Sequence, residues 1–108
     1  MDQNSKGAPD LAIAYTRPYD RILDDLSRAI ITVPQFYEAF EMNEADWDSL
    51  SKDEREVCVR TLADDLFYVL GSERSADVGL GSAEYDSGHA IIKITSDAQL
   101  VHVISLRE

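Results

Sequence analysis

The chain has 108 residues, of which 21 are acidic and 10 are basic, and its formal net charge is −11. This length predicts one domain, and 44% hydrophobic with 29% charged residues is typical of a folded domain, which excludes a disordered tail. A negative field of this size repels phosphate backbones and anionic lipids, which argues against direct binding of nucleic acid or membrane.

The N-terminal residues 1–10 are polar and contain Gly7 and Pro9, so we expect a flexible segment ahead of one α+β domain over residues 11–108. The N-terminus has no basic segment followed by an apolar run, which a signal peptide would need. No apolar stretch approaches the roughly 20 residues that span a bilayer. The single cysteine, Cys58, excludes an internal disulfide and favours a reducing compartment, and we therefore expect a cytoplasmic protein.

Helices are expected in the first two thirds of the chain. Apolar residues recur at three- and four-residue spacing over residues 19–30, and Pro34 ends or kinks that helix. Thr32 and Gln35 have the spacing of a capping box, which predicts a second short helix. Asn43 is placed to cap a further turn.

The clearest helix start in the chain is Ser51-Lys52-Asp53-Glu54, which again has the pattern of a capping box. The helix that follows is apolar over a wide face, and Gly71 is placed to end it. After Gly71 the hydrophobic period changes from about 3.6 to 2, which indicates strands.

Three strands are expected in this last part, near residues 79–85, 89–95 and 100–106. Turn residues join them at 86–88 and at 96–99. The predicted fold is therefore α+β, with three to four N-terminal helices packed on one face of a C-terminal three-stranded antiparallel β-meander.

The second turn also predicts which side chains share a face of the sheet. Centring it on Asp97 and Ala98 places Ile94 opposite Val101. In that register one face carries too many apolar residues to be an ordinary solvated surface. Either residues 11–15 cover it or a second copy of the chain does, and we favour a homodimer. The residues expected to form this self-association face are Ile91, Leu100, Ile104 and Leu106.

The densest acidic stretch spans residues 41–56, with seven acids against two bases. Trp47 lies inside it, and a tryptophan surrounded by carboxylates is typical of a binding anchor. Two structural alternatives stand beside this reading: acids stabilise helix N-termini, and Trp47 can point into the core. The residues expected to bind a partner are Glu41, Glu44, Asp46, Trp47, Asp48, Asp53, Glu54 and Glu56.

Two acidic doublets, Asp24-Asp25 and Asp64-Asp65, suggest a divalent metal between helices. Adjacent helical residues diverge by about 100°, however, so only one member of each doublet can face a shared ion. Solvated helix faces are the better interpretation. No nucleophile motif is present either, so we expect no catalytic site, no metal and no cofactor.

The resulting hypothesis is a non-enzymatic acidic module, of the inhibitor, immunity or antagonist type, that binds a basic or nucleic-acid-binding protein. The first alternative is a self-associating regulatory or scaffold protein that uses the apolar sheet face. A small metal-dependent enzyme is the most remote alternative. All three hypotheses compete with a simpler one, in which the acidic residues serve only to keep the protein soluble.

Overall fold

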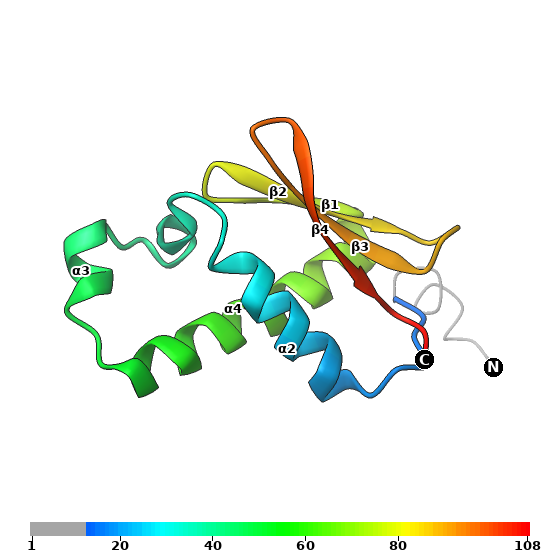
Figure 1. Ribbon diagram of the computed structural model, residues 1–108, viewed down its shortest axis with the longest axis horizontal. Coiled ribbons are helices and arrows are strands. Elements are labelled where there is room, and N and C mark those ends of the chain that lie inside the picture. Colours follow the sequence, from blue (N-terminus) through cyan, green and yellow to red (C-terminus); the bar gives the residue numbers. More distant parts are fainter. Residues whose placement is uncertain (1–12) are drawn as a thin grey trace.

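The computed structural model describes residues 13–108. The α+β prediction is confirmed, and Figure 1 shows helices packed against one face of an antiparallel sheet. The prediction of a flexible segment over residues 1–10 lies outside the described residues. The elements in chain order are helix α2 (Tyr19–Ile30), the 3-10 helix η1 (Phe36–Phe40), helices α3 (Glu44–Asp48) and α4 (Lys52–Glu73), and strands β1 (Ser75–Val78), β2 (Gly81–Asp86), β3 (Ile91–Ser96) and β4 (Gln99–Ser105).

The sheet has four strands in the order β1-β2-β3-β4, and each pair is antiparallel. The prediction of three strands was wrong because it missed β1. Helix α4 continues through Gly71 to Glu73, and Arg74 ends it in the left-handed conformation with φ 70°. The chain turns at Arg74 directly into a strand of only four residues, which is too short for its period to be read from the sequence.

Two predicted helix starts are confirmed as reciprocal capping boxes. The Asn43 side chain accepts from the backbone of Asp46, whose carboxylate accepts from the backbone of Asn43. Ser51 and Glu54 make the same pair of bonds at the start of α4. Each box satisfies backbone donors that a helix start leaves unpaired.

The capping box predicted at Thr32 and Gln35 does not form. The Thr32 hydroxyl donates instead to the backbone oxygen of Ala29, in the last turn of α2. Gln35 is left-handed, with φ 60°, and the segment after it is a 3-10 helix without a side-chain cap.

The register between β3 and β4 differs by one residue from the prediction. The turn at Asp97 and Ala98 is as expected, but a bulge beyond it leaves Val101 unmatched, so Ile94 faces His102. A slip of one residue moves every later side chain to the opposite face of a sheet. Ile104 and Leu106 are therefore buried in the core, and their assignment to an exposed face was wrong.

The core lies between the sheet and the two longer helices. Three α2 residues at four-residue spacing, Ile22, Leu26 and Ile30, are fully buried, and they meet Ile92 and Ile94 of β3 within one cluster. Helix α4 crosses beneath, and contacts both α2 and strands β1 and β2. This burial is the main stabilising contribution to the fold.

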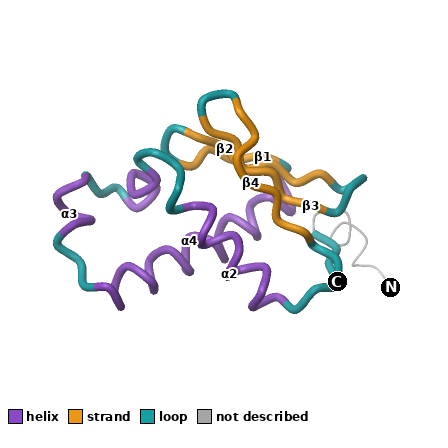
Figure 2. The backbone as a smooth tube through the Cα atoms, viewed as in Figure 1, coloured by secondary structure: helices purple, strands orange, loops and turns teal. Residues whose placement is uncertain are grey.

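The molecule is elongated, measuring 49 × 28 × 24 Å. Figures 1 and 2 show the sheet and the C-terminus at one end and α3 at the other. We call residues 36–56, which comprise η1, α3 and the first residues of α4, the acidic lobe. Figure 2 shows that this lobe is built from helices and loops alone.

The base of the acidic lobe is held against the β1–β2 turn. Gly79 lies at the turn with φ 54°, and a Cβ atom there would stand 2.5 Å from the backbone oxygen of Gln35. The backbone N–H of Leu80 donates to the oxygen of Pro34 at 3.0 Å. Only glycine fits a left-handed position this close to another backbone segment.

The observed register gives a direct stability prediction. Ile104→Ala removes a core side chain that is 2% exposed, and we expect it to lower the free energy of unfolding by about 2–5 kcal/mol. Val103→Ala truncates a side chain that is 53% exposed and should change that free energy by about 0.5 kcal/mol or less. Urea unfolding of both variants tests this, and a larger effect at Val103 than at Ile104 would show that the register is the other one.

Candidate functional site

The first acidic doublet is engaged in ion pairs within the body of the molecule. Asp25 accepts a bond of 2.6 Å from Arg17 and a second from Arg28. The hydrogen bond from Arg17, together with that from Arg28, holds the pKa of Asp25 below its ordinary value against the effect of its partial burial. Arg17 also donates to the backbone oxygen of Ser105, so Asp25 is part of the link between α2 and the end of β4.

The other member of that doublet pairs across to α4. Arg60 donates to Asp24 at 2.5 Å and lies 3.5 Å from a carboxylate oxygen of Asp20. It also donates to the backbone oxygen of Asp20. Arg60 thus ties α4 to α2, and the carboxylates of Asp24 and Asp25 are held by arginines.

The second doublet has a different environment. Asp64 accepts a hydrogen bond from the hydroxyl of Tyr19, and Asp65 is exposed. Burial first, and then Asp64, raise the pKa of Tyr19. Within residues 13–108 no group of three or more His, Cys, Asp or Glu side chains is arranged to hold a metal ion.

The seven carboxylates predicted to bind a partner are all exposed, and all lie on the acidic lobe. Two of them, Asp46 and Glu54, accept backbone N–H groups in the capping boxes. None of the seven forms an ion pair with a residue in the range 13–108. The five that make no side-chain hydrogen bond within that range are Glu41, Glu44, Asp48, Asp53 and Glu56.

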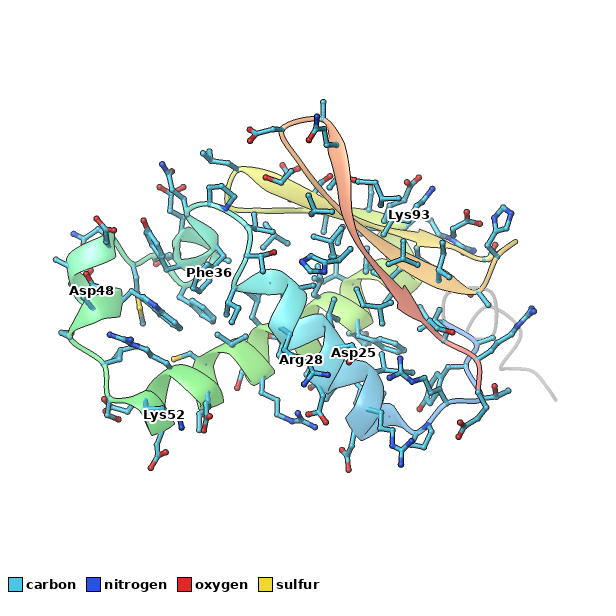
Figure 3. The ribbon with its side chains drawn as sticks, in the orientation of Figure 1. Asp25, Arg28, Phe36, Asp48, Lys52 and Lys93 are labelled. Atoms are coloured by element: carbon cyan, nitrogen blue, oxygen red, sulfur yellow. The ribbon has the colours of Figure 1, made fainter. Side chains whose placement is uncertain are left out.

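The two bases of the lobe do not neutralise these acids by direct contact. Arg55 donates to the backbone oxygens of Trp47 at 3.2 Å and Asp48 at 2.9 Å. Lys52 is exposed and has no ion pair among the described residues. Figure 3 shows Asp48 on α3 and Lys52 at the start of α4. The lobe therefore carries unpaired negative charge, whereas the aspartates of α2 are paired.

Trp47 is a packing residue of the lobe rather than a freely exposed anchor. Its ring meets Phe36 edge-on at 4.9 Å between centroids and stacks with Phe40 at 6.3 Å. The Arg55 guanidinium lies 5.7 Å from the indole centroid, within cation–π range. Trp47 is half-buried and packs against the hydrophobic core, so it joins the lobe to the body of the molecule.

The self-association face is rearranged by the bulge. Leu100 is exposed as expected, and Ile91 is half-buried. Val101, which the predicted register placed opposite Ile94, is 44% exposed, and Val103 is 53% exposed. The exposed apolar side chains of β4 are thus Leu100, Val101 and Val103.

A groove of about 640 Å³ lies between α2, η1, α3 and the first half of α4. It was missed in the sequence because its walls come from four separate elements, and no local spacing brings them together. Figure 3 shows three of its residues, Arg28, Phe36 and Lys52, on three of these elements. The groove combines aromatic and aliphatic side chains with several charged ones.

Comparison with known proteins returned no matching family model, and neither a curated protein nor a solved structure matches the chain. Among the described residues, no helix is long and apolar enough to cross a membrane.

The ion pairs of Asp25 predict a pH-dependent contribution to stability. Because its folded pKa lies below the unfolded value, that contribution is complete well above pH 3.8 and is lost as the pH falls through the folded pKa. Asp25→Asn should therefore destabilise the protein at pH 7 and have little effect at the lowest pH at which the protein stays folded. Urea midpoints measured across this range test it. Asp65→Asn is the control and should show neither effect, and a pH-independent loss in Asp25→Asn would contradict the assignment.

Proposed function

We propose that this chain is a non-enzymatic acidic module that binds a basic surface of a protein partner through the carboxylates of the acidic lobe. One observation carries the proposal: arginines pair with the aspartates of α2, while the seven acids of residues 41–56 have no ion pair with a described residue. Exposed acids without an ion pair among the described residues also lie outside the lobe, as at Asp65 and Asp77, but the lobe holds seven of them within residues 41–56.

The state of these carboxylates suits association. Five make no side-chain hydrogen bond or ion pair with a residue in the range 13–108, so no such contact has to break when they meet a cation. Opposite charge steers such encounters and raises the association rate, an effect that salt screens. The lobe also lies at one end of the long axis, opposite the C-terminus (Figure 1), where a partner surface can approach it. If the partner uses its basic surface in its own function, for example as a groove for nucleic acid, binding of the lobe would block that surface. The chain would then act as an inhibitor, an immunity protein or an antagonist.

The test compares two triple variants that remove the same charge. The lobe variant carries Glu44→Gln, Asp48→Asn and Asp53→Asn, which leaves both capping boxes intact. The control variant carries Asp65→Asn, Glu73→Gln and Asp77→Asn, which are exposed and lie outside the lobe. A partner is captured from a lysate of the source cells at low salt, purified, and its association rate with each variant is measured.

We expect the lobe variant to lower the association rate about tenfold or more at low salt, and the control to change it by less than about twofold. Raising the salt concentration should reduce the difference between the two. Equal rates for the two variants, or a captured partner that binds without salt dependence, would refute the role of the lobe.

Self-association remains a second candidate because of strand β4. It is an edge strand of seven residues with no Lys, Arg, Asp, Glu or Pro, and it exposes Leu100, Val101 and Val103. Natural sheets commonly protect such edges with charge or proline. An antiparallel pairing of β4 with β4 of a second copy would cover the strand.

Light scattering at high protein concentration tests this candidate. We expect a mass of twice 12.1 kDa for the native chain and a monomer for Val103→Lys, which places a charge on the edge strand. Leu80→Lys is the control because Leu80 is equally exposed but lies in the β1–β2 turn, and it should remain dimeric. A native chain that stays monomeric rules out this candidate.

A further inference from the structure

The groove between α2, η1, α3 and α4 is lined by more bases than acids, whereas the whole chain has more acids than bases. Four of the ten bases line it, against two of the 21 acids. The four bases are Arg28, Lys52, Arg55 and Arg60. A chain with a net charge of −11 therefore concentrates positive charge in one hollow, where an anionic ligand is favoured.

Two of these four cations, Lys52 and Arg55, form no ion pair with a carboxylate of the described residues. Arg28 and Arg60 pair with aspartates of α2. Arg55 instead bonds neutral backbone oxygens, and Lys52 has no ion pair among the residues that the structure describes. Lys52 and Arg55 are three residues apart on α4, which places them on the same side of the helix.

Arg55 is held in position before any ligand arrives. Its Nε donates to the oxygen of Trp47 and its Nη2 to that of Asp48, and the guanidinium lies over the indole ring. A guanidinium has more N–H donors than these two bonds use, so donors remain for an anion. A side chain fixed in this way loses little conformational entropy on binding.

The remaining walls are suited to an apolar group. Phe36, Trp47 and Val59 line the groove with rings and methyl groups, and Ile31 lies at the α2 side. The hydroxyl of Ser27, which also lines the groove, is buried and has no hydrogen-bond partner within the described residues. A buried polar atom of this kind is usually satisfied by water or by a ligand atom.

We propose that this groove binds a small organic anion, with a planar apolar body against Phe36, Trp47 and Val59 and a carboxylate at Lys52 and Arg55. Its volume of about 640 Å³ falls in the range of small-molecule sites. Charge-assisted bonds to a carboxylate supply orientation, and burial of the planar body supplies affinity. Glu56, one of the seven carboxylates of the proposed function, also lines the groove, whereas the other six do not, and the binding of a small anion does not depend on that function.

Three probes separate the parts of this recognition: 3-phenylpropionate, its neutral amide 3-phenylpropanamide, and propionate, which lacks the ring. Trp47 is the only tryptophan in the chain and lines the groove, so its fluorescence reports binding, and calorimetry gives the affinity independently. We expect saturable binding of the acid, and affinities about tenfold or more weaker for the amide and for propionate.

A pair of variants assigns the site. Lys52→Gln removes an exposed groove cation and should weaken binding of 3-phenylpropionate about tenfold while leaving the amide unchanged. Arg21→Gln removes one positive charge from an exposed position outside the groove and should leave both affinities unchanged. The proposal is overturned if the acid gives no saturable signal at millimolar concentration, if the amide binds equally well, or if the two variants behave alike.

Discussion

The packing of α2 against both α4 and the sheet determines how charge is distributed over this molecule. One side of α2 is fully buried, so its aspartates lie at the two edges of that side, where α2 borders the neighbouring elements. Arg17 pairs with Asp25 at the edge beside β4. Arg60 of α4 pairs with Asp24 at the other edge. Because these arginines are paired with α2, they are not available to neutralise the charge of the remaining acids. The densest group of carboxylates without an ion pair among the described residues lies at the far end of the molecule's long axis.

The lobe that receives this surplus is joined to the body by a small aromatic cluster. Trp47 contacts Phe36 and Phe40 in this cluster and also lines the groove. Because the hydrogen bonds of Arg55 go to backbone oxygens of Trp47 and Asp48 rather than to carboxylates, they do not neutralise the acids of the lobe.

Local features of the fold were readable from the sequence, and non-local ones were not. The capping box at Ser51 and the N-cap at Asn43 were predicted because each depends on residues that are close together in the sequence. The register of β4 was not, since a bulge at Val101 leaves no mark in the alternation of apolar residues. The acidic stretch is contiguous and was identified, whereas the pairing of Asp24 with Arg60 and the walls of the groove depend on helices that meet only after folding.

The contact at Gly79 has a consequence for how the molecule can vary. The backbone of Pro34 and Gln35 leaves no room there even for a methyl group, so the root of the lobe and the sheet form one rigid joint. Exposed residues of the lobe outside the two capping boxes can vary while the direction of the lobe stays the same, because that direction is set by the contact with a hairpin that is distant in the sequence. A family of such chains would be expected to diversify at the tip and to keep this one glycine.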